Sequence, residues 1–194
     1  MAAPRLLQPA DFGGEVANIH NSLGHTLFKT LSISWTKPRV WKRDEPAPKG
    51  LADVTAAYVY ALTRDHGKSL RKPPIVYIGL SKNRTRFYNH PKAKKIRNMK
   101  GKTLVSIGII DFGKHHHKKG TKPAIEEIEH LLIWALSPKF NEKKKFTMPG
   151  MGKNPGRAWH VRNIEHRFNG QMPREIVYPW MLIKLGRDRS KKKV

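Results

Sequence analysis

The sequence predicts an α+β fold with a small core in the order β-β-α-β-α, in which helices flank a central three-stranded sheet. Two apolar segments rich in β-forming residues, 57–63 and 75–80, are separated by a polar loop at 64–74 that contains glycine and proline. A third such segment spans 103–113. In 123–136, apolar residues recur with the period of a helix. Elements in this order favour a small mixed sheet with helices packed on it.

Local signals support each of these elements in turn. The first segment is apolar on both sides, and its short connection to 75–80 predicts that the two strands pair in antiparallel fashion. Residues 81–90 are typical of a turn into a helix, and Pro91 either breaks that helix or opens a second one. Thr121 is placed to cap the following helix. The last segment, 175–186, is expected to be a strand or a short helix.

The core is expected within residues 52–142, between two extensions. Residues 1–51 form an N-terminal arm, because their apolar residues end in a linker-like, proline-containing run at 42–50. This arm either packs on the core or contacts a partner with its own cations. Residues 143–194 form a basic C-terminal extension whose last residues are expected to be disordered.

The charge of the chain indicates what kind of partner it has. Lysine and arginine total 39 against 14 acidic residues in a chain of 194, which gives a formal net charge of +25. Such an excess predicts a polyanionic partner, and nucleic acid is the commonest one. A membrane is not expected, because no stretch approaches the ~20 apolar residues that span a bilayer. Ribosomal proteins share this composition, so charge alone does not identify an enzyme.

The chain contains no cysteine, which excludes disulfides, thiolate zinc sites and cysteine nucleophiles. Residues 1–15 lack the apolar core of a signal peptide. With no membrane-spanning segment either, these features predict a cytoplasmic protein, and another intracellular location would fit equally well.

Glu129 lies in an unexpected position on the predicted helix. It shares one face with the apolar residues Ile125, Ile128, Leu132, Ile133 and Leu136. A carboxylate on a core-facing stripe is costly unless it is paired with a cation or holds a metal. Tyr60 and Tyr77 on the two preceding strands, and an arginine-rich stretch around Arg86, accompany it. In a strongly basic chain, this set of side chains indicates chemistry on phosphate.

The segments VYAL (59–62), YIG (77–79), RFYNH (86–90) and EHLLIWALSPKFN (129–141) follow one another in this order along the chain. Together they resemble the motifs of the GIY-YIG nuclease superfamily, in particular its free-standing, restriction-endonuclease-like members. Residues 59–62 (VYAL) resemble the first motif, and residues 77–79 (YIG) match the second. Residues 86–90 (RFYNH) are similar to the family helix with its arginine and a following histidine. Residues 129–141 (EHLLIWALSPKFN) resemble the last motif, with its glutamate, proline, aromatic residue and asparagine. The resemblance covers residues 57–141.

The resemblance implies a phosphodiester hydrolase that uses one metal ion and a tyrosine, without a covalent intermediate. Carried over residue by residue, it implies that the catalytic residues are Tyr60, Tyr77, Arg86, His90, Glu129 and Asn141. The sequence departs from the family pattern at two positions. Tyr58 replaces the glycine of the first motif, and Leu80 replaces a basic residue that often follows the second. The second change removes a side chain that would contact phosphate or relay a proton.

Elementary chemistry gives these residues roles. Glu129, with waters in the remaining positions, suits one Mg²⁺ (or Mn²⁺) ion per active site. The forked donors of Arg86 suit phosphate oxygens. Tyr60 or Tyr77 would orient or deprotonate the attacking water. A base role requires a nearby cation, because the ordinary pKa of tyrosine is about 10.

The same residues also have ordinary structural interpretations. Either tyrosine alone fits a plain strand residue, and Arg86 alone fits a solvated charge. His90 fits a helix cap, Asn141 fits a residue that ends a helix or satisfies a turn, and Glu129 fits a buried ion pair. Arg84 competes with Arg86 for the arginine role, although the spacing to the histidine favours Arg86.

The sequence therefore predicts a metal-dependent endonuclease that hydrolyses DNA phosphodiester bonds, of the restriction or mobile-element type. Two alternatives stay open: a non-catalytic nucleic-acid-binding protein of ribosomal or nucleoid type, and a nuclease that acts on RNA. The expected partner is nucleic acid, double-stranded DNA first, and a homodimer is left open. Three consecutive histidines at 115–117 make a poor chelate and are expected in a mobile basic loop. The predicted nucleic-acid contacts are Lys82, Arg84, Lys114, Lys143, Lys144, Lys145, Lys153 and Arg157.

Overall fold

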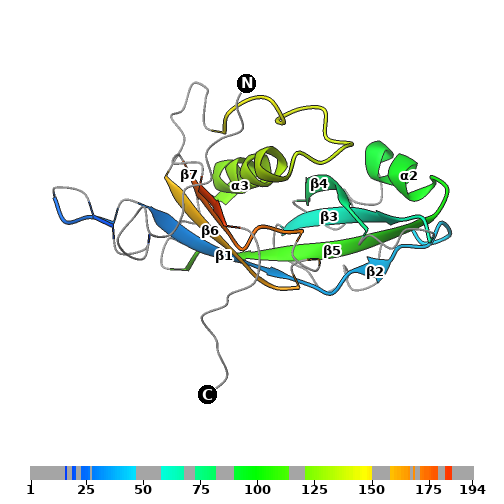
Figure 1. Cartoon of the computed structure of the whole chain (residues 1–194), viewed down its shortest axis with the longest axis horizontal. Coiled ribbons are helices and arrows are strands. Elements are labelled where there is room, and N and C mark those ends of the chain that lie inside the picture. Colours follow the sequence, from blue (N-terminus) through cyan, green and yellow to red (C-terminus); the bar gives the residue numbers. More distant parts are fainter. Residues whose placement is uncertain are drawn as a thin grey trace, which may run out of the picture.

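The computed structural model describes residues 16, 19–20, 23–26, 28–46, 58–67, 73–81, 90–113, 121–149, 158–166, 168, 171–178 and 182–184. The strands are β1 (Lys29–Trp35), β2 (Arg39–Val40), β3 (Tyr58–Asp65), β4 (Ile75–Ser81), β5 (Lys102–Asp111), β6 (Trp159–Glu165), β7 (Glu175–Tyr178) and β8 (Leu182–Lys184). The helices of this part are α2 (Pro91–Arg97) and α3 (Thr121–Leu136) (Figure 1). Neither of them has the length and apolar character needed to cross a membrane.

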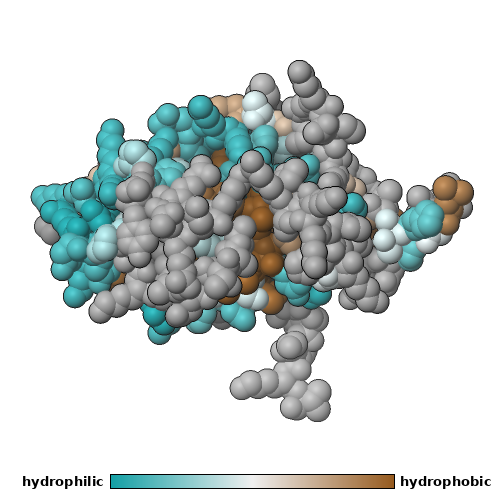
Figure 2. All heavy atoms as spheres, turned by 180° about the vertical axis from the view of Figure 1, so that it is seen from behind, coloured by the Kyte–Doolittle hydropathy of each residue, from teal (hydrophilic) through white to brown (hydrophobic). Residues whose placement is uncertain are grey.

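The strands form one mixed sheet in the order β4-β3-β5-β1-β6-β7-β8, and β2 pairs with β5 beside this path. The pairings are antiparallel except that of β1 with β6, which is parallel. Figure 1 shows α3 lying across the sheet near β4 and β7, and α2 near the far ends of β3 and β5. Seen from behind, hydrophilic residues cover much of the described surface, and a hydrophobic strip lies at its centre (Figure 2).

The predicted fold class is wrong. We expected an α+β core around a three-stranded sheet, whereas the described chain is mostly β, with a larger mixed sheet and two helices. The difference arises at β5, because its second edge is occupied by β1, which pairs with it between Ser32 and Trp35. Strands β6, β7 and β8 then extend the sheet from β1. These segments had been assigned to extensions, so their pairing with the core was missed.

Strand β1 shows why the N-terminal segment joins the sheet. Leu31, Ile33 and Trp35 are buried, and the residues between them are partly exposed. This period of two is the pattern of a strand that buries one face. The indole Nε1 of Trp35 donates a hydrogen bond of 2.9 Å to Oδ1 of Asn163 on the neighbouring β6. Strands from all three predicted segments thus contribute to one sheet, and the boundaries at 51 and 142 stay a prediction.

Strand β3 is buried on both faces, because helices cover both sides of this part of the sheet. Val59 and Ala61 pack in a cluster with Ile128 of α3. Tyr60 packs in a second cluster with Ile96 of α2. Since alternate residues of a strand point to opposite faces, α3 and α2 lie on opposite sides of β3. The two tyrosines predicted for the site lie on the α2 side.

Candidate functional site

The register of β3 and β4 brings the two predicted tyrosines together. Tyr60 lies opposite Gly79, and Tyr77 lies opposite Leu62. After this pair the register shifts, so that β4 contains one extra residue, Val76. The bulge allows the adjacent residues Val76 and Tyr77 both to join the cluster on the α2 side. The centroids of the two tyrosine rings are 6.1 Å apart.

Gly79 leaves the space that the Tyr60 ring occupies. A β-carbon added to Gly79 would overlap Cζ, Oη and Cε1 of Tyr60. A strand glycine often marks such a close approach of another group. Tyr60 is 1 % exposed, so its ring has little freedom to move aside. The glycine of the YIG segment therefore has a packing role beneath a predicted site residue.

His90 contacts both tyrosines from the start of α2. Its ring stands edge-on to those of Tyr60 and Tyr77, at centroid distances of 6.4 and 5.9 Å. Its Nδ1 accepts a hydrogen bond of 3.2 Å from the backbone N–H of Ala93, which makes His90 the N-cap of the helix. In the neutral imidazole the proton then lies on Nε2, which is 3.5 Å from the Tyr77 hydroxyl. His90 thus caps a helix and contacts a site tyrosine.

Glu129 of α3 is 15 % exposed and forms an ion pair. Its Oε2 accepts a hydrogen bond of 2.7 Å from Nζ of Lys144, in the segment that follows α3. The structure therefore contains the ion pair that the structural interpretation of Glu129 expected. The charge of Glu129 also acts on the hydroxyl of Tyr60, so the carboxylate lies within electrostatic reach of that tyrosine.

Burial raises the pKa of Tyr60 well above the ordinary value of 10.0. The neighbouring Tyr77 and the carboxylate of Glu129 raise this pKa further, because their negative charge disfavours a phenolate at Tyr60. At neutral pH the Tyr60 hydroxyl is therefore protonated. In this state it donates a hydrogen bond and does not accept a proton.

Asn141 holds the outer edge of β4. Its Oδ1 accepts from the backbone N–H of Ile78 at 2.9 Å, and its Nδ2 donates to the carbonyl of Ile78 at 2.8 Å. The backbone N–H of Phe140 donates to the carbonyl of Val76 at 2.8 Å. The segment after α3 thus covers an edge that would otherwise present unpaired backbone groups. This geometry gives Asn141 a role in positioning β4, and the catalytic role proposed for it stays a prediction.

A metal site at Glu129 would depend on a single carboxylate. The part of the chain that the structure describes contains no group of three or more histidine, cysteine or acidic side chains able to hold a metal. Mg²⁺ suits a sparse site, because it keeps several waters and binds through one or two carboxylates and substrate phosphates. The donor chemistry therefore fits Mg²⁺ if the ammonium of Lys144 leaves Oε2.

Several predicted site residues lie outside the described residues, so their positions stay predictions: Lys82, Arg84, Arg86, Lys114, Lys153 and Arg157. The three histidines at 115–117, which were expected in a basic loop, also lie outside the described residues. Of the other predicted nucleic-acid contacts, Lys143 is exposed, and Lys144 and Lys145 are half-buried. The Nζ of Lys145 lies 5.8 Å from the ring centroid of Phe146.

Two residues of this region have roles that sequence reasoning missed. Lys144 was predicted to contact nucleic acid, not to pair with Glu129. Arg64 was assigned to the polar loop, whereas it belongs to β3 and is buried. A signal for Arg64 was present, because it continues the alternation of Tyr60 and Leu62 on one face of the strand.

Comparisons of the chain with protein-family models, with curated proteins and with solved structures found no match. The resemblance to GIY-YIG nucleases therefore rests on the residues of the four motifs.

Proposed function

We propose that the chain is a metal-dependent endonuclease that hydrolyses phosphodiester bonds in DNA. The main support is the convergence of Tyr60, Tyr77 and His90, with Glu129 close enough to act on Tyr60. Hydroxyls that orient water, an imidazole, and a carboxylate for a cation are groups that phosphodiester hydrolysis requires. A net charge of +25 supplies affinity for a polyanion.

The two tyrosines have different surroundings, which supports different roles. Tyr60 keeps its proton at neutral pH, so it is suited to donate a hydrogen bond to the attacking water or to a phosphate oxygen. Tyr77 lies against Nε2 of His90, whose N–H would stabilise a phenolate at Tyr77. We therefore propose that Tyr77 accepts the proton from the attacking water and that Tyr60 orients this water.

Glu129 is the residue that would hold Mg²⁺ (or Mn²⁺), and a bound cation would polarise the phosphate and neutralise its charge. Lys144 occupies Oε2 of Glu129, so its ammonium must turn away for the carboxylate to serve as a ligand. The lysine would then stand free next to the phosphate as a counter-charge. Arg86 is predicted to add a second cation to the phosphate oxygens.

The ion pair between Glu129 and Lys144 also favours a second candidate function. A carboxylate that a lysine already neutralises has no need of a metal. On this alternative, the chain binds nucleic acid through its positive charge without cutting it, as a ribosomal or nucleoid protein does.

Incubation of the purified protein with supercoiled plasmid and Mg²⁺, and separately with EDTA, distinguishes these functions. Metal-dependent conversion of the plasmid to nicked or linear forms, with ends that can be mapped, supports the endonuclease. Retarded but intact plasmid with Mg²⁺ and with Mn²⁺ supports the binding protein. A parallel RNA substrate that is cut while the plasmid stays intact would move the activity to RNA.

A further inference from the structure

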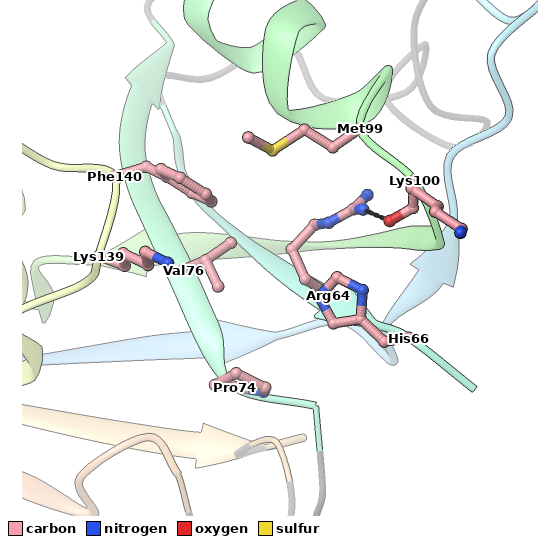
Figure 3. Close-up of a pocket in the computed structure, with 8 residues that line it drawn as sticks. All are labelled: Arg64, His66, Pro74, Val76, Met99, Lys100, Lys139 and Phe140. Atoms are coloured by element: carbon pink, nitrogen blue, oxygen red, sulfur yellow. Dashed lines mark hydrogen bonds between the residues drawn. The ribbon is translucent and has the colours of Figure 1, made fainter. Parts of the chain in front are cut away.

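A cavity lies beyond the tyrosine cluster, between β3, β4 and the turn after α2 (Figure 3). Its volume is about 390 Å³, within the range of roughly 300–1,000 Å³ that small-molecule sites occupy. Arg64 lines it from β3, four residues after Tyr60 and therefore on the same face of the strand. Because a β-strand rises about 3.3 Å per residue, the positions of Tyr60 and Arg64 are about 13 Å apart along β3.

Arg64 supplies this cavity with a buried positive charge. Arg64 is 3 % exposed, and its guanidinium donates to the carbonyl oxygens of Ile96 and Lys100 and to Oγ1 of Thr103. These partners are neutral, and within the described ranges no carboxylate forms an ion pair with Arg64. A buried charge without a counter-ion is costly, so an anionic ligand would be stabilised beside it.

The wall opposite Arg64 is apolar and aromatic. Figure 3 shows Phe140 and Val76 across the cavity from Arg64 and His66, with Met99 above them. The hydrogen bond from the backbone N–H of Phe140 to the carbonyl of Val76 holds the main chain that carries this ring beside β4. A flat aromatic wall that faces a guanidinium suits a planar ring system, because both surfaces stack on aromatic rings.

Further cations stand at the mouth of the cavity. Lys100 and Lys139 are exposed, and Nζ of Lys139 lies 5.8 Å from the ring centroid of Phe140. A planar ring stacked on Phe140 would therefore have positive charge on either side. A planar ring with an attached anion is the chemistry of a nucleotide.

We propose that this cavity binds one unpaired nucleotide, with its base against Phe140 and its phosphate toward Arg64 and Lys139. The nucleotide comes from one of two sources, a free nucleoside monophosphate or an unpaired position in a nucleic-acid strand. The strand source rests on the proposed function. It places the phosphate of the unpaired nucleotide toward Arg64, whose position on β3 lies about 13 Å from that of Tyr60.

Fluorescence titration without divalent metal tests this site while DNA stays intact. The two probes are 2-aminopurine nucleoside monophosphate and a duplex with one extrahelical 2-aminopurine, and a fully paired duplex is the reference. Phe140→Leu keeps apolar bulk but removes the ring, so the affinity for an unpaired base should fall about tenfold or more. Phe146→Leu is the matched control, because Phe146 is 89 % exposed and also has a lysine 5.8 Å from its ring.

A second variant, Lys139→Gln, keeps the test valid if Phe140→Leu lowers the melting temperature. Lys139→Gln should reduce the log–log salt slope of binding to the duplex with the extrahelical base by about one, because it removes one phosphate contact. If the two variants lose affinity only for the duplex with the extrahelical base, the site binds an unpaired position in a strand. If they lose affinity only for the monophosphate, the site binds a free nucleotide. Unchanged affinities of Phe140→Leu and Lys139→Gln for both probes would overturn the proposal. Nucleotide binding by a protein that never cuts would refute the proposed function and leave this site standing.

Discussion

The ring of Tyr60 lies directly over the backbone of Gly79, its partner in the register of β3 and β4. The absent side chain of Gly79 makes room for the ring, and the ring in turn stands against Tyr77 and His90. The position of the Tyr60 hydroxyl therefore depends on the absence of a side chain at residue 79.

Gly79→Ala should displace the Tyr60 ring, because the added methyl group overlaps it. Overpacking of this kind costs about 1–3 kcal/mol of unfolding free energy, and plasmid cleavage should fall with it. Urea denaturation and a cleavage time course measure the two effects. In a Tyr60→Ala background the ring is gone, so Gly79→Ala should cost much less. An equal penalty in both backgrounds would show that the overlap is not the cause.

Asn141→Ala should destabilise the fold rather than change metal dependence. It removes both hydrogen bonds to the backbone of Ile78 and leaves buried polar groups without partners. The expected loss is about 1–3 kcal/mol, read from urea denaturation. Asn98→Ala is the control, because Asn98 is exposed and its side chain bonds only the neighbouring Arg97 among the described residues. Full stability of Asn141→Ala with abolished cleavage would instead assign Asn141 to the chemistry.

The raised pKa of Tyr60 predicts how stability depends on alkaline pH. Unfolded tyrosine ionises near pH 10, whereas folded Tyr60 holds its proton to higher pH because it is buried. The stabilisation is fully present below pH 10 and is lost as the pH rises from 10 toward the folded-state pKa. Tyr60→Phe should flatten this decline in urea denaturations above pH 10. A decline as steep as that of the parent would contradict the assignment.

Lys144→Ala should lower the Mg²⁺ concentration that gives half-maximal cleavage, because the lysine competes for Oε2 of Glu129. It should also reduce the log–log salt slope of DNA binding by about one, since one phosphate contact is lost. Lys143→Ala is the matched control for the Mg²⁺ requirement, because Lys143 is exposed and has no hydrogen bond to Glu129 among the described residues. If both variants require the same Mg²⁺ concentration as the parent, Lys144 does not compete with the metal.

The sequence predicted local elements better than it predicted the sheet. The apolar run around Tyr60 and the period of Ile128 and Leu132 are local signals, and β3 and α3 lie where they indicate. The pairing of β1 with β5 joins residues such as Trp35 and Gly108, which are far apart in the chain. No local pattern specifies that partner, which is why the fold class was wrong.

The candidate site shows the same limit. The helical phase of Glu129 indicated a carboxylate that needs a partner, and the structure pairs it with a cation. The partner is Lys144, which adopts a φ of 69° in the segment that follows α3. Such a left-handed conformation is uncommon outside glycine, so the sequence had no means of indicating it.

Glu129→Gln tests the central claim most directly, because it keeps the shape of the side chain and removes the charge that would hold the metal. Glu142→Gln is the matched control, since Glu142 also pairs with a lysine, Lys92, but is 83 % exposed. With Mg²⁺ and plasmid in single-turnover conditions, the cleavage rate of Glu129→Gln should fall by about 10²-fold or more. The rate of Glu142→Gln should equal that of the parent. Both variants should bind DNA as tightly as the parent. Cleavage by Glu129→Gln at the rate of the parent would contradict a metal-dependent site at Glu129.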